Sequence, residues 1–352
     1  RQKDRKRQMD RTGLGIIDGF DGTESSILGG FQNVNAITAG NSLNDKLSGL
    51  NADSDWLLDG TDQYLSTNSL DFERFEILIG GDGVDSFYIS GARSYHALRG
   101  GSGNDIFDLA SGATLTLITS LGLVGNLDGQ GGADTLDYTD FTVAEPVLVD
   151  LPPGVATAIS NDNPGDVGAI LNIENAIGGA ADDRFVSDTN NNIFQGNAGN
   201  DTYQFFDNWG LDEIFDLAGL LDVLDFSSAT LALTFTLGSV VVTAGSNKLT
   251  HAGNEIEKII GGQGDDSFVF SANGVVFAGG TGVLDGHSGI DTLDYAGGTP
   301  SASAYTDPVT VNLGTNTATG TGGVMNIENI IGGSGADSLT GDGLDNVLRG
   351  NE

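Results

Sequence analysis

Residues 330–339 read Ile-Ile-Gly-Gly-Ser-Gly-Ala-Asp-Ser-Leu, and the interpretation of the whole chain starts from this stretch. Two apolar residues run into a Gly-Gly-x-Gly-x-Asp sequence, and an apolar residue, Leu339, follows two places after Asp337. Glycine adopts positive φ without a Cβ clash, so a glycine run can curl tightly. The stretch therefore predicts a strand, a sharp turn and a second strand.

The same motif recurs at 80–87, 100–107 and 261–268, and looser copies end at Asp134, Asp183, Asp201 and Asp291. The residue two places after each aspartate is apolar or aromatic, namely Phe87, Phe107, Leu136, Phe185, Tyr203, Phe268, Leu293 and Leu339. Most residues four places after it are apolar too. A period of two with one apolar face predicts β-strands that bury that face.

The turns also carry a specific set of ligand atoms. A tight glycine turn aims carbonyl oxygens inward, and the aspartate at its end adds carboxylate oxygens. Such a set has oxygen donors only, without His or Cys, which suits Ca²⁺ at six to eight ligands. Mg²⁺ fits less well because it demands octahedral geometry and keeps its waters.

These segments resemble the hemolysin-type, or RTX-like, calcium-binding repeats of large bacterial secreted and cell-surface proteins. Eight related copies that keep the apolar register carry the resemblance. It implies an all-β fold, a right-handed parallel β-solenoid (β-roll/β-helix) with Ca²⁺ bound between successive glycine-rich turns. In a coil of two strands, turns 18 residues apart, as at Gly178 and Gly196, should stack, whereas Gly332 and Gly341 should lie on opposite sides.

The predicted metal ligands follow from this pattern. The side-chain ligands are Asp85, Asp105, Asp134, Asp183, Asp201, Asp266, Asp291 and Asp337. The assisting carbonyls belong to Gly80, Gly100, Gly178, Gly196, Gly261 and Gly332, and Asp128 and Asp285 are secondary candidates. Three turns depart from the motif, with Leu284 or Asn346 in place of the aspartate or Ala181 in place of the third glycine, so these half-sites should be weak or empty.

A longer period overlies the turns. The segments 134–138, 222–226 and 291–295 are near-identical, and each precedes a β-rich pair beginning at 146–151, 230–237 or 308–313. A closing strand follows at 172–177, 254–260 or 326–331 and runs straight into a glycine turn. Insertions of variable length between constant strands are typical of solenoids, because each coil contacts only its neighbours. In the early coils we expect Trp56, Leu57, Leu65, Leu70 and Phe72 in the core.

The composition independently favours bound cations. The chain has 352 residues, with 55 Gly, 49 Asp and Glu against 14 Lys and Arg, no Cys, and a net charge of −35. So large a charge repels itself in a compact body unless counterions are bound. The absence of Cys excludes disulfides and thiol catalysis. No run of about 18 apolar residues occurs, so we expect no membrane span.

Residues 1–11 differ from the rest, with six basic and two acidic residues. We interpret them as a basic arm or linker, 12–79 as irregular early coils, and 80–352 as the repeat solenoid, continuous with 12–79. The arm is either a solvated tail or a segment that docks on an acidic neighbour, a second copy included. The start at Arg1 and the end in another turn predict a piece of a longer protein.

We expect a calcium-binding structural or adhesive segment of a secreted or bacterial cell-surface protein, and no enzyme. The interior basic residues and the three His are scattered, the acid pairs lie inside the turns, and no nucleophile elbow, P-loop or zinc motif is present. Two alternatives stay open: self-assembly into a surface filament or lattice through open solenoid ends and the arm, and an accessory module of a secreted carbohydrate-active enzyme. A surface polysaccharide is an open partner, whereas nucleic acid is not expected, since the acidic body repels phosphate.

Overall fold

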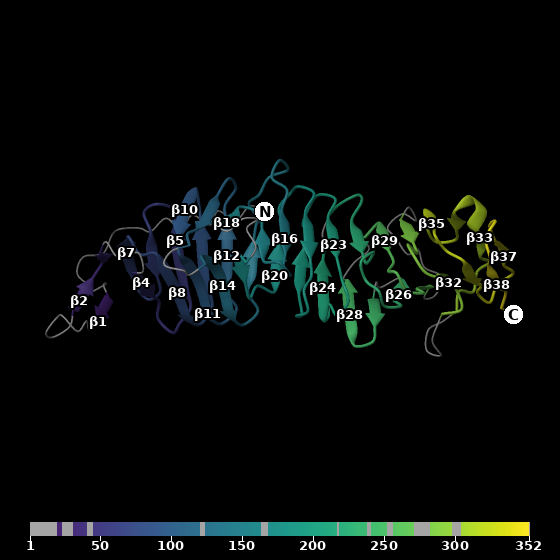
Figure 1. Ribbon diagram of the computed structural model, residues 1–352, viewed down its shortest axis with the longest axis horizontal. Helices are drawn as coiled ribbons and strands as arrows, with labels where there is room; N and C mark the ends of the chain where they lie inside the picture. The colour runs from purple at the N-terminus through teal and green to yellow at the C-terminus, as the bar shows by residue number, and fades with distance from the viewer. Residues whose placement is uncertain are drawn as a thin grey trace.

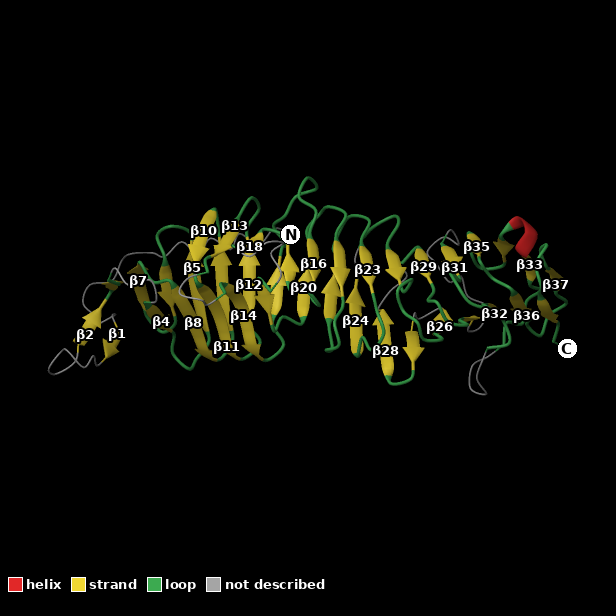
Figure 2. Ribbon diagram, in the orientation of Figure 1, coloured by secondary structure: helices red, strands yellow, loops and turns green. Residues whose placement is uncertain are grey.

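A computed structural model of the chain describes residues 20–22, 31–40, 45–119, 124–162, 168–216, 218–237, 241–251, 256–270, 282–297 and 304–351. The basic arm predicted at 1–11 lies outside these residues. The described chain is an elongated stack of short strands, arranged in rows along its longest axis (Figures 1 and 2). The described residues form an all-β stack apart from a short 3₁₀ helix, η2 (Leu313–Thr315).

Three sheets run along the stack, and we name them I, II and III. Sheet I contains β3 (Ala36–Thr38), β5 (Ser54–Leu58), β6 (Gln63–Leu65), β7 (Ser69–Glu73), β9 (Asp85–Ile89), β12 (Ile106–Leu109), β15 (Thr135–Asp137), β20 (Asn175–Ile177), β22 (Ile193–Gln195), β24 (Leu211–Phe215), β26 (Thr234–Leu237), β27 (Val241–Ala244), β28 (Asn247–His251), β30 (Ser267–Phe270), β32 (Thr292–Asp294), β36 (Asn329–Ile331) and β38 (Val347–Arg349). Sheet II contains β10 (Ala92–Tyr95), β13 (Thr114–Leu117), β16 (Leu148–Asp150), β17 (Val155–Ala156), β18 (Ile159–Asn161), β21 (Arg184–Val186), β23 (Thr202–Gln204), β25 (Val223–Asp225), β29 (Lys258–Ile260), β31 (Val283–Asp285) and β35 (Gly323–Met325).

Sheet III is shorter and contains β4 (Lys46–Ser48), β8 (Ile77–Asp82), β11 (Ala97–Ser102), β14 (Asn126–Gly131) and β19 (Ile170–Leu171). Small sheets are made by β1 (Phe20–Gly22) with β2 (Phe31–Val34), and by β33 (Thr310–Asn312) with β34 (Thr317–Ala318) and β37 (Ser338–Thr340). Within sheets I to III most neighbouring strands come from successive coils and pair in parallel. The long parallel sheets make the fold solenoid-like, as the repeats predict.

The predicted period of two is confirmed along sheet I. Phe87, Phe107 and Leu136 are in register on neighbouring strands, and each is fully buried. The Phe87 and Phe107 rings stack at 5.0 Å between centroids, and Trp56 stacks on Phe87 at 5.4 Å. In parallel stacking, the same apolar position of every coil lies above the last, so one row of side chains forms a continuous core.

The early coils correct one part of the core prediction. Trp56, Leu70 and Phe72 are buried as expected, but Leu57 and Leu65 are only half-buried. Trp56 and Leu58 point into the core from β5, so the alternation of the strand turns Leu57 to the opposite face. Leu65 is turned outward in the same way, because its neighbour Tyr64 is the buried residue of β6.

The number of strands per coil changes along the chain, which the turn spacing does not reveal. In the first part, strands of sheets III, I and II follow one another, as in β8, β9 and β10, then β11, β12 and β13. Sheet III ends at β19. From β20 to β25 the chain alternates between sheets I and II only. The 20 residues from Gly80 to Gly100 thus hold three strands instead of the expected two, since short strands and tight corners fit the same length.

The β-rich pairs and closing strands are confirmed as strands. Each pair begins with a strand, β16, β26 or β33, that folds back on an antiparallel partner, β17, β27 or β34. The closing strands are β20, β29 and β36. The insertions are therefore hairpins held at the edges or within the stacked sheets, and they leave the parallel core rows continuous.

The sequence motif predicts Leu284 at the aspartate position of a turn, but the structure places it in a strand. It is fully buried in β31, in register with Ile259 and Val324 in the core row of sheet II. Residues 279–281 lie outside the described residues. Among the described residues, no helix has the length and apolar character needed to cross a membrane.

Candidate metal centre

Each glycine turn packs its aspartate back onto its own first glycine. The carboxylate five residues later lies where a glycine Cβ would be: a Cβ on Gly80 would come within 2.3 Å of Asp85 Oδ2, and one on Gly196 within 2.1 Å of Asp201 Oδ2. The same holds for Gly100, Gly129, Gly178, Gly261, Gly286 and Gly332 with the aspartate of their own turn. Only glycine leaves room for this carboxylate, which explains the spacing of the motif.

The aspartates of successive turns form columns, in which each backbone N–H donates to the carboxylate one coil further on. In column 1, Asp85 N donates to Asp105 Oδ1 at 2.9 Å and Asp105 N donates to Asp134 Oδ1 at 2.7 Å. Column 2 links Asp183 to Asp201 and Asp201 to Asp222, each at 2.7 Å. Column 3 links Asp266 to Asp291 at 2.7 Å. Asp337 Oδ1 accepts from Val309 N at 2.9 Å in the small sheet.

Every column ends on a glutamate that the sequence reasoning missed. Glu174 accepts from Asp134 N at 2.9 Å, Glu257 from Asp222 N at 2.9 Å, and Glu328 from Asp291 N at 2.8 Å. All three lie in the closing-strand segments, which lack a glycine turn before them. The available signal was an acidic residue just before a closing strand, at the register of the motif aspartates.

The columns bury carboxylates that are only half satisfied. Asp85, Asp105, Asp134 and Asp201 are 0 % exposed, and Asp291 is 1 % exposed. Their Oδ2 atoms are buried without a hydrogen-bond donor, as is Oδ2 of the half-buried Asp337. By contrast, Asp183 Oδ2 accepts a hydrogen bond from Gly179 N, and Asp266 Oδ2 accepts one from Gly262 N. A buried carboxylate oxygen without a donor is costly unless it binds a cation or a proton.

Burial raises the pKa of these carboxyl groups above the ordinary value of 3.8. The pKa is raised to about 6 for Asp85, about 7 for Asp134 and Asp291, and about 8 for Asp201. Loss of solvation is the largest cause in each case, and neighbouring carboxylates add to it. Without cations, these carboxyls must therefore either take up protons or stay buried and charged near neutral pH, and both cost free energy of folding.

We expect the fold to become more stable on acidification when divalent cations are removed. A carboxyl whose pKa is raised on folding contributes stability that is fully present below about pH 4 and is lost as pH rises through the folded-state values. In buffers stripped of divalent cations by a chelating resin, the thermal midpoint should rise by at least about 4 °C between about pH 8 and about pH 5. A midpoint in these buffers that instead increases with pH over this range would contradict the buried columns.

Four of the six predicted glycine carbonyls divide into two groups. In the first group the carbonyl lies near a column carboxylate. The carbonyl oxygen of Gly100 lies 2.1 Å from the Cβ position of Gly80, and Asp85 Oδ2 lies 2.3 Å from the same point, so the two oxygens are no more than 4.4 Å apart. The Gly196 carbonyl approaches Asp183 Oδ2 in a similar way, through the Cβ position of Gly178. The carbonyls of Gly178 and Gly332 instead accept side-chain amides, from Asn197 and Asn351, each at 2.7 Å.

Asp128 and Asp285, the secondary candidates, hold neighbouring coils together. Asp128 Oδ1 accepts from Asn172 Nδ2 at 2.7 Å and from Gln130 N at 3.2 Å. Asp285 Oδ1 accepts from Asn326 Nδ2 at 2.7 Å and from His287 N at 3.1 Å. Both carboxylates lie outside the columns, and the Oδ1 atom of each already accepts two hydrogen bonds.

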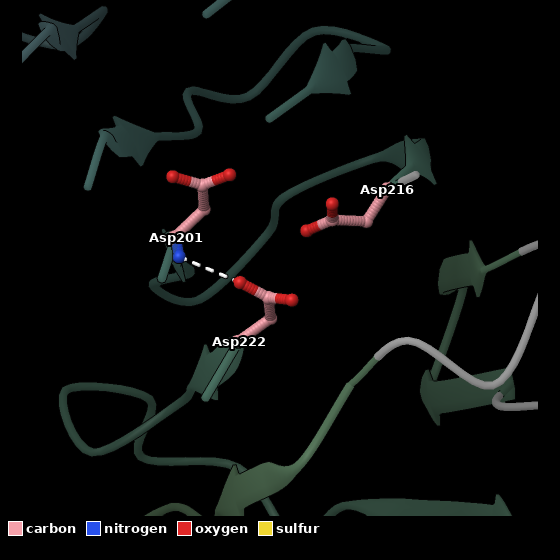
Figure 3. A group of neighbouring side chains, drawn as sticks. All are labelled: Asp201, Asp216 and Asp222. Carbon is pink, nitrogen blue, oxygen red and sulfur yellow. Dashed lines mark hydrogen bonds between the residues drawn. The ribbon is translucent and has the colours of Figure 1, made fainter. Parts of the chain in front are cut away.

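Three aspartates of the described chain, Asp201, Asp216 and Asp222, form a cluster. All three side chains are buried, and one oxygen from each lies within 4.8 Å of the others. Figure 3 shows them around a common space, with Asp216 reaching in from the end of β24. The Tyr203 hydroxyl donates to Asp216 Oδ2 at 2.8 Å. This arrangement has the oxygen donors of a metal site.

Only Asp201 of this cluster was predicted as a ligand. Asp222 begins one of the near-identical segments of the long period, so its register was visible although its turn, 216–222, lacks the Gly-Gly-x-Gly sequence. Asp216 carries no sequence signal. Asp212, also missed, is 2 % exposed with a donor-free Oδ2, and burial raises its pKa to about 8. Its Oδ1 accepts from Asn192 N at 2.9 Å, as the column carboxylates do.

The chain was also compared with known proteins. No protein-family model matches it, and a search of curated proteins gives no match.

Proposed function

We propose that the chain is a calcium-binding structural segment of a secreted or bacterial cell-surface protein, and that its solenoid-like stack, right-handed as in RTX-like repeats, becomes rigid on binding Ca²⁺. The observation that carries this proposal is the set of columns, in which buried carboxylates meet in successive coils with donor-free Oδ2 atoms. The residues present fit the ion, because carboxylate and carbonyl oxygens are the donors that Ca²⁺ takes.

Electrostatics explain why such a fold needs cations. Neighbouring parallel strands lie about 4.8 Å apart, so ionised carboxylates at the same position of successive coils repel each other by roughly 3 kcal/mol at an effective dielectric constant of 20. The backbone N–H bond to each Oδ1 offsets part of this repulsion. A divalent cation beside the Oδ2 atoms would turn the net electrostatic interaction in the column from repulsive to attractive.

This arrangement supports folding controlled by calcium. Where free calcium is micromolar or less, the columns repel and the coils stay apart. Outside the cell, where modules of this kind bind at roughly 10⁻⁴–10⁻³ M, the turns fill. A site held at ten times its Kd adds about 1.4 kcal/mol, and five or six such sites reach the net stability of a domain, about 5–15 kcal/mol.

The test is thermal unfolding followed by circular dichroism in about 5 mM CaCl₂, in MgCl₂ and in EGTA. We expect a β spectrum with a high midpoint in CaCl₂, a much lower midpoint or no fold in EGTA at neutral pH, and only weak rescue by MgCl₂. A midpoint that is indifferent to chelation would leave the turns as glycine corners and overturn the proposal.

Three further roles remain predictions from the sequence. They are adhesion to a surface polysaccharide, assembly into a filament or lattice, and a role as an accessory module of a carbohydrate-active enzyme. The same holds for the absence of catalysis and for the secreted or cell-surface location. A calcium-stabilised structural segment is compatible with each of these settings.

A further inference from the structure

The Asp201, Asp216 and Asp222 cluster differs from every glycine turn described above, because one of its carboxylates comes from outside the motif. We propose that these three residues form a separate calcium site, which binds more tightly than the turns and keeps its ion after the turns have been emptied. This inference rests on the proposed function, since it assumes that the chain meets calcium.

A donor-free oxygen points to a ligand at this cluster. Asp201 is 0 % exposed, and its Oδ1 already accepts from Asp183 N at 2.7 Å. Its Oδ2 has no hydrogen-bond donor, although it is buried beside two further carboxylates. A carboxylate oxygen in this position is stabilised by a cation, and among the residues that the structure describes no donor takes its place.

Tyr203 positions the third carboxylate. It is fully buried in β23, and its hydroxyl donates to Asp216 Oδ2 at 2.8 Å. A bond to one oxygen of a carboxylate sets the direction of the other, so Asp216 is held toward the cluster before any ion arrives. The hydroxyl also lies beside Asp201, 2.4 Å from the Cβ position of Gly196.

The number of charges sets the order of binding. A glycine turn contributes its own aspartate and that of the next coil, whereas this cluster brings three carboxylates together within 4.8 Å. Affinity in oxygen sites rises with the number of charged ligands and the rigidity of the site. A monovalent ion would leave two charges unbalanced, and Mg²⁺ demands an octahedral geometry that three buried carboxylates do not offer.

An ion here would join three successive strands. Asp201 precedes β23, Asp216 follows β24 and Asp222 precedes β25, so the ion would tie sheet II to sheet I within one coil. The turn 216–222 lacks the glycine sequence of the other turns, and its Leu220 and Leu221 are exposed. The cluster therefore supplies a constraint that the local sequence of this turn does not.

The test compares the full chain with D216N. Asparagine keeps an oxygen that can accept the Tyr203 hydroxyl but removes one of the three charges. The matched control is D140N, which removes an exposed charge that is not part of any column. Calcium bound per chain is measured by equilibrium dialysis against graded EGTA buffers, and circular dichroism checks that each variant folds in excess CaCl₂.

We expect the wild-type chain and D140N to release one last calcium ion at a free concentration at least about tenfold below that of the other ions. D216N keeps the Asp201 and Asp222 carboxylates, the two that a glycine turn has, so its last ion should leave at the same free calcium concentration as the others. If D216N binds as many ions as wild type with the same affinities, the inference is wrong while the proposed function stands. If the wild-type chain binds no calcium at all, the proposed function itself fails.

A second measurement decides the matter if D216N does not fold. Hydrogen exchange of wild-type residues 218–222 is followed in an EGTA buffer that has emptied all but the last ion, and in excess EGTA. If the amides of this segment are protected from exchange in the first buffer and lose that protection in excess EGTA, the result supports the site. Equal exchange in both buffers, with protection changing elsewhere, overturns it.

Discussion

Replacing Gly80 by alanine is expected to destabilise the fold by about 3 kcal/mol or more, a fall of roughly 4 °C or more in thermal midpoint. The new Cβ would lie 2.1 Å from the Gly100 carbonyl oxygen and 2.3 Å from Asp85 Oδ2. Neither atom can retreat, since the first belongs to the backbone of the next coil and the second to a buried column. The coils must move apart, which also breaks the bond from Asp85 N to Asp105.

Fluorescence of Trp56, in a W209F background that removes the second tryptophan of the chain, is the appropriate measurement, because its ring stacks on Phe87 in the same part of the stack. Solenoids can unfold in pieces, so a local probe is more informative than a global one. The control is G343A, at the third position of the last turn (residues 341–346), where a Cβ meets no heavy atom within 4 Å. Equal losses in G80A and G343A would show that the clash is not the reason for the first glycine.

The triple variant D85N/D105N/D134N should change stability in opposite directions with and without calcium. Without calcium, the substitutions remove three buried charges and keep the acceptors of the column bonds, so the midpoint should rise. With calcium, they remove ligands of the ion, so most of the stabilisation by CaCl₂ in this part should be lost. Each effect should amount to several kcal/mol, since buried charges without partners cost at least that much.

Asparagine already occurs at this kind of position, so the variant should fold. Asn192 is fully buried at the start of β22, and its N–H donates to Asp212 Oδ1 at 2.9 Å. Asn346 follows Gly341 by five residues and places its Oδ1 where the column aspartates place Oδ2. Midpoints in EGTA and in CaCl₂ are compared with those of D82N/D140N, which removes exposed charges. Destabilisation of the triple variant in both buffers would mean that the columns do not respond to cations.

Much of the local structure was predictable because it depends on neighbours in sequence. Phe87 and Phe107 were expected in the core from their place two residues after an aspartate, and burial of one strand face makes that rule hold. The failure at Leu57 and Leu65 has the same origin: where no turn sets the phase, apolar residues alone do not show which face is buried.

The contacts between coils were not predictable in the same way. Asp134 meets Glu174, 40 residues later, because a hairpin of variable length is inserted between their coils. Asp216 joins Asp201 and Asp222 although it lies outside the glycine motif. Neither partner follows from a nine-residue period.

The sequence by itself determined the repeating unit: a glycine turn, an aspartate five residues after its first glycine, and a strand with alternate residues buried. These features are local, since they depend on the space at a glycine Cα and on the two-residue alternation of a strand. Only the tertiary structure decided that coils change from three strands to two, which carboxylates share a column, and where three of them meet. Those outcomes depend on the length of each insertion and on how many corners a coil makes, and a local period carries no information about either.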